Sequence, residues 1–152
     1  MKKFLKTDEW NIIEEGFHAD KLRASESIFS LGNGRFGQRG NFEETYSSDS
    51  LQGSYVAGIS FLDRTRVGWW KNGYPHFFSR IPNAPDWSGI YLRLIDEEVD
   101  LSQWDIKQFE RKLDMKEGIS YRDFEVTSPK GNTLKIHAVS YTHLTLPTNS
   151  LV

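Results

Sequence analysis

Cysteine, strong net charge and long apolar runs are all missing from this chain of 152 residues. Without cysteine the chain can form neither disulfides nor thiolate metal sites, which fits a reducing compartment. A formal net charge of −2 gives no electrostatic reason to expect nucleic acid. No run approaches the roughly 20 apolar residues that a membrane-spanning helix needs. We therefore expect neither a nucleic-acid partner nor a membrane partner.

Signals for secretion and for metal binding are also missing. The segment 1–9 begins with basic residues, but it holds only two apolar residues before charge resumes, so it has no secretory apolar region. The four histidines are dispersed, without the spacing that places two ligands on one face of a helix. We expect a cytoplasmic protein without a metal or a cofactor.

Turn residues and alternating apolar positions predict the fold. Asn33-Gly34 lies between the apolar segments 28–31 and 35–36, Asn72-Gly73 offers a second turn, and residues 129–132 a third. Residues 73–87 contain three prolines, which predicts an ordered loop. No long helical period occurs. We expect strands at 91–95, 99–101, 108–113, 119–127 and 133–139, and an all-β fold of the antiparallel β-sandwich type.

A glycine pattern at residues 32–37 matches the dinucleotide-binding fingerprint Gly-x-Gly-x-x-Gly. That site needs a helix directly after the turn and an acidic residue about 20 positions later. Here Gly40 and Asn41 oppose a helix, and the residue 20 positions after Gly37 is Ala57. We interpret the glycines as positions of positive φ or of close backbone packing.

Two groups of residues are candidates for a functional role. Trp69 and Trp70 are adjacent, so in a strand their side chains point to opposite faces and one faces outward. With Tyr74 they could stack on a sugar, cover another domain or meet a second subunit, and the interface is favoured over the sugar. Arg39 and Glu43 could hold a phosphate and act as an acid, but we favour an ion pair or hydrogen bond that anchors the glycine-rich loop.

Three segments carry a resemblance to a known family: residues 26–53, with the run Ser-Leu-Gly-Asn-Gly-Arg-Phe-Gly-Gln-Arg-Gly-Asn-Phe-Glu-Glu, residues 67–75, with Val-Gly-Trp-Trp-Lys-Asn-Gly-Tyr-Pro, and residues 82–85, with Pro-Asn-Ala-Pro. From about Trp10 to about Val139 the chain resembles the N-terminal region of glycoside hydrolase family 65, and within it the members that act on maltose. The resemblance implies an N-terminal β-sandwich, followed in the family by a helical linker and an (α/α)6 barrel with the catalytic acid and the phosphate site.

The reaction implied for the parent protein is phosphorolysis of maltose, with inversion, to β-glucose 1-phosphate and glucose. Inorganic phosphate is then a co-substrate. The implied partners are the barrel domain, a second subunit in a homodimer, and the disaccharide. Since the acid and the phosphate ligands lie beyond residue 152, no catalytic residue can be transferred to this chain, and we expect it to be inactive alone. Phosphorolysis of kojibiose, nigerose or trehalose, or a non-catalytic carbohydrate-binding sandwich, remain the alternatives.

The resemblance ends near Val139. We therefore expect residues 1–139 to form the β-sandwich domain, incomplete at its C-terminal end. Residues 140–152 are expected to be a non-family tail, produced by read-through or truncation, that makes no native packing. A divergent final strand is the alternative.

Overall fold

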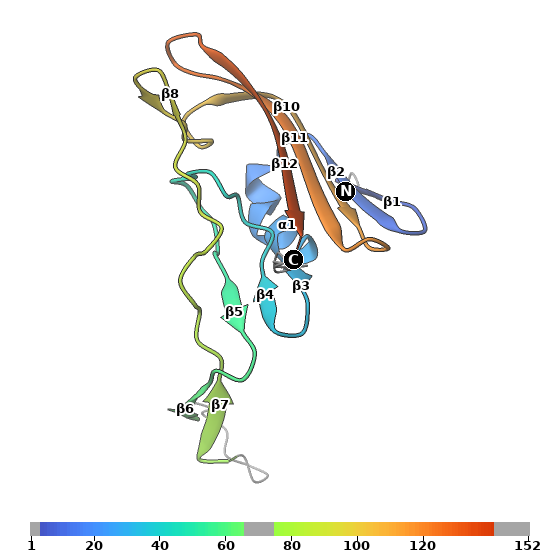
Figure 1. Cartoon of the computed structure of the whole chain (residues 1–152), viewed down its shortest axis with the longest axis vertical. Coiled ribbons are helices and arrows are strands. Elements are labelled where there is room, and N and C mark those ends of the chain that lie inside the picture. The colour runs from blue at the N-terminus through green and yellow to red at the C-terminus, as the bar shows by residue number, and fades with distance from the viewer. Residues whose placement is uncertain (1–3, 66–74, 142–152) are drawn as a thin grey trace, which may run out of the picture.

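The computed structural model describes residues 4–65 and 75–141. Its largest element is a five-stranded antiparallel sheet with the strand order β1-β2-β10-β11-β12 (Figure 1). The strands are β1 (Leu5–Thr7), β2 (Asn11–Glu15), β10 (Asp105–Asp114), β11 (Ile119–Thr127) and β12 (Thr133–Tyr141). Segments from both ends of the sequence therefore meet in one sheet, because β2 pairs with β10.

Three smaller sheets and two short helices complete the described structure. The strands are β3 (Leu31–Gly32), β4 (Phe36–Gln38) and β5 (Ser54–Val56) in one sheet, β6 (Phe61–Arg64) with β7 (Phe77–Arg80), and β8 (Arg93–Leu94) with β9 (Glu97–Glu98). The helices are η1 (Ala19–Lys21) and α1 (Leu22–Ile28). All strand pairs within these sheets are antiparallel, which confirms the predicted all-β antiparallel class. The β6–β7 hairpin projects away from the large sheet (Figure 1).

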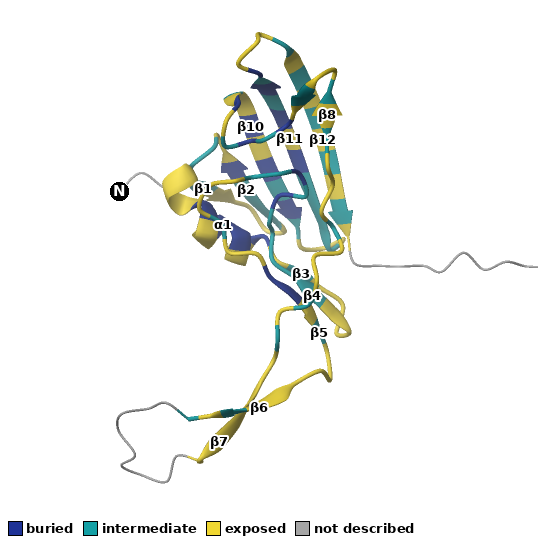
Figure 2. Ribbon diagram, turned by 90° about the vertical axis from the view of Figure 1, so that its left-hand side faces the viewer, coloured by how far each residue is buried: buried dark blue, intermediate teal, exposed yellow. Residues whose placement is uncertain are grey.

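The core lies on one face of the large sheet. Alternation along β10 and β11 buries Phe109, Leu113, Phe124 and Val126 on this inner face, while Glu110, Lys112 and Glu125 point to the opposite, outer face. The inner face is covered by one side of α1 and by the chain around residues 42–46 and 99–104, most of which is coloured as buried or intermediate in Figure 2. The sheet thus supplies one wall of the core, and irregular chain supplies much of the other.

Helix α1 corrects one sequence expectation. The apolar segment 28–31 was expected to be the first strand of a hairpin, but Ile28 ends α1 and only Leu31 and Gly32 form β3. The helix forms because Leu22, Ser25 and Glu26, spaced three and four residues apart, face the interior together. The Asn33-Gly34 turn itself is confirmed: Gly34 has φ +82° and joins β3 to β4.

The remaining expectations are met in part. Strand β11 has the predicted bounds, β10 is longer than predicted, and Gly131, at φ +89°, lies in the predicted turn between β11 and β12. Val99 and Leu101 are buried, but residues 99–101 form no strand and only an isolated bridge from Asp100 to Thr45, and of residues 91–95 only Arg93 and Leu94 form a strand. The loop expected at 73–87 contains β7, because its prolines flank the strand without interrupting it. The Asn72-Gly73 turn lies outside the described residues.

Strand β12 continues two residues past the expected domain boundary at residue 139, and the boundary itself stays a prediction. Ser140 and Tyr141 pair with Ser120 and Ile119 of β11, and the Ser140 hydroxyl donates to Glu43 Oε1 at 2.5 Å. These two residues therefore do make native packing. Residues 142–152 lie outside the described residues. None of the described helices is long and apolar enough to cross a membrane.

Candidate functional site: a buried arginine–glutamate cluster

Strand register places three charged residues in one row on the inner face of the sheet. Arg111 of β10 lies opposite Glu14 of β2 on one side and opposite Arg122 of β11 on the other. All three are buried, with relative exposures of 1% for Glu14, 3% for Arg111 and 4% for Arg122. Two like charges directly opposite each other in a sheet are destabilising, so this row needs compensating carboxylates.

The buried guanidinium group of Arg111 finds its counter-charge on β2 and a hydrogen-bond acceptor in the loop after β4. Its Nε and Nη2 donate to Glu14 Oε2 at 3.2 and 3.0 Å, and its Nη1 donates to the Gly40 carbonyl at 2.7 Å. The other Glu14 oxygen accepts from the Ser25 hydroxyl of α1 at 2.9 Å. Burial lowers the pKa of Arg111, and the charge of Glu14 opposes that effect. The pair therefore joins the sheet, α1 and the loop at one point.

The charge of Arg122 is balanced by carboxylates of the segment that crosses the inner face of the sheet. Its Nη2 donates to Glu43 at 2.6 Å and also to Glu44. The Phe42 ring lies beneath both guanidinium groups, with its centroid 4.6 Å from Cζ of Arg122 and 5.5 Å from Cζ of Arg111. A guanidinium group within about 6 Å of an aromatic ring centroid is attracted by the ring. Residues 42–44 are thus fixed to the sheet by charge and by packing.

Partly buried Arg39 and fully buried Glu26 form a second ion pair beside the first. Arg39 Nη2 lies 3.7 Å from Glu26 Oε2, and Arg39 also donates to the carbonyls of Leu51, at 2.7 Å, and Arg23, at 2.9 Å. Glu26 accepts from the Leu51 amide at 2.9 Å. The Nε and Nη2 groups of Arg39 therefore donate to the protein's own carbonyls, which anchors the loop after β4 to residues 23 and 51.

Gly40 is required by this arrangement. A Cβ at residue 40 would lie 2.8 Å from both Cβ and the carbonyl oxygen of Phe29, closer than real Cβ atoms approach backbone. The Gly40 amide donates to the Glu26 carbonyl at 2.7 Å while its own carbonyl accepts from Arg111. The glycine thus lets the loop approach α1 and the sheet at the same time.

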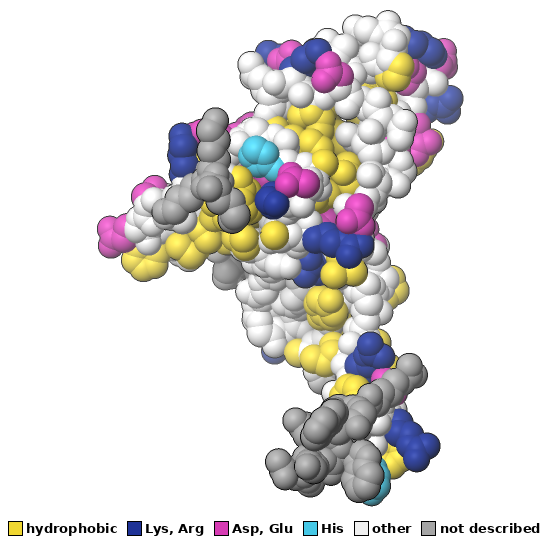
Figure 3. Space-filling view, turned by 180° about the vertical axis from the view of Figure 1, so that it is seen from behind, with side chains coloured by type: hydrophobic (Ala, Val, Ile, Leu, Met, Phe, Trp, Pro, Cys, Tyr) yellow, Lys and Arg dark blue, Asp and Glu magenta, His cyan; other side chains and the backbone are white. Residues whose placement is uncertain are grey.

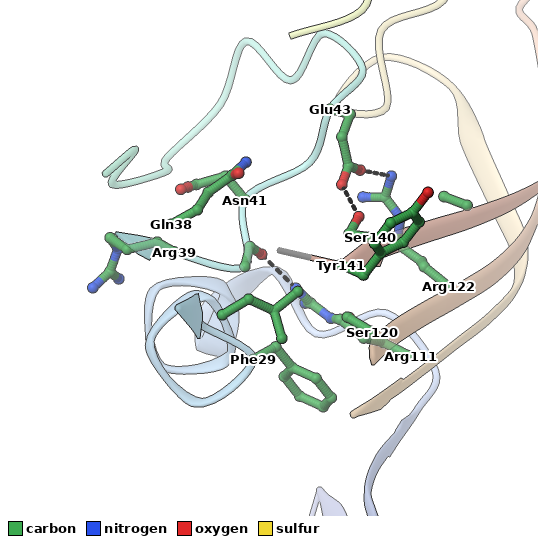
Figure 4. Close-up of a pocket in the computed structure, with 13 residues that line it drawn as sticks. Phe29, Gln38, Arg39, Asn41, Glu43, Arg111, Ser120, Arg122, Ser140 and Tyr141 are labelled. Carbon is green, nitrogen blue, oxygen red and sulfur yellow. Dashed lines mark hydrogen bonds and ion pairs between the residues drawn. The ribbon is translucent and has the colours of Figure 1, made fainter. Parts of the chain in front are cut away.

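A small cavity of about 50 Å³ lies within this cluster (Figure 4). Arg111, Arg122, Glu43 and Ser140 contribute to its lining, while the Arg39 side chain points away from the other two arginines. Ligand pockets have volumes of about 300 to 1,000 Å³, so this cavity is too small for a sugar. The cluster contains three arginines, at 39, 111 and 122, and four glutamates, at 14, 26, 43 and 44, all in ion pairs. These ion pairs therefore serve to hold the parts of the fold together.

Two of the predicted candidates, Arg39 and Glu43, lie within the described residues, and both line the small cavity. Arg39 and Glu43 lie in the cluster but bind different partners, Glu26 and Arg122 respectively. Trp69, Trp70 and Tyr74 lie outside the described residues. Among the described residues, no group of three or more His, Cys, Asp or Glu side chains is placed to hold a metal ion.

Sequence reasoning missed Arg111 and Arg122, although a signal was present. Both occupy inward positions of alternating strands, Arg111 between Phe109 and Leu113, and Arg122 before Phe124 and Val126. A charged residue in phase with core positions indicates a buried ion pair. The carboxylate partners could not have been found in this way, because they come from β2 and from an irregular loop.

Comparison with known proteins shows the family to which this chain belongs. The family model described as "Glycosyl hydrolase family 65, N-terminal domain" matches residues 12–148. The chain belongs to glycoside hydrolase family 65. Maltose phosphorylase of Bacillus subtilis (strain 168) is 46% identical over 143 residues, which cover 94% of this chain and 19% of that protein. The family match extends past the boundary that was expected at residue 139.

Other relatives in family 65 have different names. Kojibiose phosphorylase of Halothermothrix orenii is 36% identical over 127 residues, covering 84% of this chain and 15% of that protein. Alpha,alpha-trehalose phosphorylase of Thermoanaerobacter brockii is 37% identical over 136 residues, covering 85% and 17%. A solved structure assigned as a kojibiose phosphorylase from the human microbiome matches 90% of this chain and 18% of its own, with a TM-score of 0.73 and 34% identity. The chain thus spans about one fifth of the length of these relatives.

Proposed function

We propose that this chain is the N-terminal domain of a family 65 phosphorylase that acts on maltose, and that it contributes structure, with no catalytic group of its own. The observation that carries the choice of substrate is the 46% identity to a maltose phosphorylase, against 36% and 37% for kojibiose and trehalose phosphorylases. Kojibiose, nigerose and trehalose are the alternative substrates.

The proposed reaction is the phosphorolysis of maltose, with inversion, to β-glucose 1-phosphate and glucose. It requires a carboxylic acid that protonates the leaving glycosidic oxygen and a phosphate held on the opposite face of the sugar. In the described part of this chain, the buried carboxylates already accept from arginines or hydroxyls, and the buried arginines already donate to carboxylates or carbonyls. We therefore assign both chemical roles to the parent protein's further domain.

Three further parts of the proposal concern surroundings and partners. The domain packs against a helical barrel in the parent polypeptide, and the parent forms a homodimer. Trp69, Trp70 and Tyr74 serve one of these interfaces in preference to a sugar, because Trp is enriched at the buried centres of interfaces. The parent works in the cytoplasm, a location that the absence of cysteine from residues 1–152 favours.

Two assays test the proposal. The purified chain, mixed with maltose and inorganic phosphate, is expected to release no β-glucose 1-phosphate above a control without protein. The complete parent protein is expected to convert maltose with a higher kcat/KM than kojibiose, nigerose or trehalose. Turnover by the chain alone would contradict the structural role, and preference for another disaccharide would replace the substrate. Maltose binding by the chain, without turnover by the parent, would instead favour a carbohydrate-binding module.

A further inference from the structure

The turn between β3 and β4 places an asparagine directly before a glycine on the protein surface. Asn33 and Gly34 are both exposed, and apart from its chain neighbours no heavy atom lies within 4 Å of the position that a Cβ on Gly34 would take. Every other asparagine of the described residues is followed by a residue with a side chain: Ile12, Phe42, Ala84 or Thr133. Among the described asparagines, Asn33 alone is therefore followed by a backbone amide that no Cβ shields.

The side-chain amide of Asn33 is held in a defined orientation by the turn. Its Oδ1 accepts from the backbone amide of Arg35 at 3.0 Å and from that of Phe36 at 2.8 Å, which makes this an Asx turn. The backbone amide of Asn33 itself donates to the Phe36 carbonyl at 3.0 Å and closes the hairpin. Two backbone N–H groups therefore converge on the one oxygen atom that is bonded to Cγ of Asn33.

Two converging N–H groups are the arrangement that stabilises an oxyanion. When a nucleophile attacks a carbonyl carbon, negative charge collects on the carbonyl oxygen, and donors about 2.7 to 3.1 Å from that oxygen stabilise it. The donors of Arg35 and Phe36 lie within this range. Hydrogen bonds to a charged acceptor are about twice as strong as those to a neutral one, so both bonds strengthen as the charge develops. Contacts that strengthen in the transition state lower the barrier.

The nucleophile is the backbone nitrogen of Gly34. Its attack on Cγ of Asn33 closes a five-membered ring, so no second molecule has to be positioned. Within the described part of the chain the N–H of Gly34 has no hydrogen-bond partner, and its proton can be lost without breaking a bond of the fold. Glycine also leaves the nitrogen uncrowded, because it has no Cβ.

We propose that Asn33 is a site of spontaneous deamidation, for which the turn supplies the oxyanion donors and Gly34 the nucleophile. The Gly34 nitrogen loses its proton to a solvent base and bonds to Cγ, the bond from Cγ to Nδ2 breaks, and the side-chain nitrogen takes up a proton and leaves as ammonia. The product is a succinimide. Water then opens this ring, at Cγ to give aspartate or at the backbone carbonyl to give isoaspartate.

The modification changes both the charge and the turn. It adds one negative charge to a chain whose formal net charge is −2. Acidic and basic side chains lie next to one another on the surface shown in Figure 3, so the added charge joins a surface of mixed sign. Isoaspartate also inserts an extra backbone atom into the turn. This should weaken the pairing of Leu31 with Gln38 and of Gly32 with Gly37, which the turn aligns.

Peptide mapping by mass spectrometry tests the proposal. The purified chain is incubated at mildly alkaline pH and digested, and the conversion of each described asparagine to the acid is followed, with aspartate and isoaspartate separated by chromatography. We expect Asn33 to convert at least tenfold faster than the other described asparagines, with isoaspartate among its products. The rate at Asn33 in the folded chain should be no lower than in the same chain unfolded in guanidinium chloride, which lacks the converging donors. The other described asparagines are Asn11, Asn41, Asn83 and Asn132.

Two matched variants identify the nucleophile. Gly34→Ala adds a Cβ beside the attacking nitrogen and should slow the conversion of Asn33 about tenfold. Gly37→Ala, which adds a Cβ in equally open space in β4, should leave the rate unchanged. Because alanine at the φ of +82° found for Gly34 strains the turn, the comparison is repeated in the unfolded chain, where only crowding by the Cβ remains. Asn33→Asp, which keeps an oxygen for both donors, should show no conversion at this residue.

Three results would overturn the proposal. They are conversion of Asn33 no faster than that of the other described asparagines, conversion to aspartate without isoaspartate, and slower conversion in the folded than in the unfolded chain. The second would indicate direct hydrolysis by water, and the third would show that the two hydrogen bonds protect the amide. None of these measurements involves a disaccharide or phosphate, so failure of this proposal is distinguishable from failure of the proposed function.

Discussion

Replacing Glu14 by Gln should destabilise the domain by about 3 kcal/mol, because it leaves Arg111 buried without its counter-charge. Breaking a buried ion pair from one side costs about 3 to 5 kcal/mol. We expect the lower end, since Arg111 keeps the Gly40 carbonyl at 2.7 Å and the Phe29 ring, 4.8 Å from Cζ to the centroid. Small domains have total stabilities of about 5 to 15 kcal/mol, so the loss is large.

Urea denaturation followed by far-UV circular dichroism measures this effect. With an m-value of about 1.5 kcal/mol per molar urea, the midpoint should fall by about 2 M at unchanged m. The matched control is Glu15→Gln, one residue further along β2 and on the outer face. Its carboxylate pairs with Lys6 at 2.6 Å, but both side chains are more than half exposed, at 52% and 68%. Exposed pairs contribute little, so this midpoint should move by less than about 0.5 M.

A double replacement separates the charge from the packing. Changing Glu14 and Arg111 together to Met removes both charges and keeps much of the buried volume, and buried pairs replaced in this way are often as stable as before. We expect the double variant to regain more than half of the loss, with some cost because Ser25 and the Gly40 carbonyl lose their partners. If Glu14→Gln and Glu15→Gln shifted the midpoint equally, the buried pair would not be stabilising the sheet and the reasoning would be refuted.

Two further predictions concern the loop and pH. Gly40→Ala should cost about 1 to 3 kcal/mol in urea denaturation, because the new Cβ meets Phe29 backbone at 2.8 Å, whereas Gly37→Ala, with open space at its Cβ, should cost less. A similar loss at both positions would contradict the steric argument.

Burial raises the pKa of Asp100, but hydrogen bonds from Ser47 and Ser102 outweigh it and leave the pKa below its ordinary 3.8. Asp100 therefore contributes stability above about pH 4 that is lost as pH falls below it, and Asp100→Asn should flatten that acid limb of the stability profile; an unchanged limb would exclude Asp100 as its source.

The sequence predicted the parts of the fold whose signal is local. Strand β11 was found with its bounds, although only Phe124 and Val126 alternate in phase with the core, and the turns at Gly34 and Gly131 were found because glycine tolerates the positive φ that each requires. Helix α1 was missed because seven residues carry too little period to distinguish a helix from a strand. It is stabilised by tertiary contacts of Ser25 and Glu26, which no local pattern contains.

The charge cluster could be predicted only in part, for a related reason. Alternation places Arg111 and Arg122 on the core face, so their burial was readable from the strands. Glu14, the partner of Arg111, lies 97 residues away in the sequence, and Glu43, a partner of Arg122, lies 79 residues away. Only the folding of distant segments onto each other brings these pairs together. Glu43 was identified as an anchor beside the glycines, but its partner was not. The roles of Trp69 and Trp70 stay predictions.

The buried charges also determine how the strands align. Successive side chains of a strand face opposite sides, so a slip of β10 by one residue against β2 would turn Arg111 to the outer face and bury Lys112 or Glu110 in its place. Glu14 would then lose its bidentate donor, and the Gly40 carbonyl would lose the Arg111 Nη1 bond. The same slip would also turn the apolar neighbours Phe109 and Leu113 to the outer face, so apolar burial and the buried charges favour the same register. In this domain the row of Glu14, Arg111 and Arg122 therefore restricts the sheet to one register, and this is the register in which residues 42–44 can be fixed across the core.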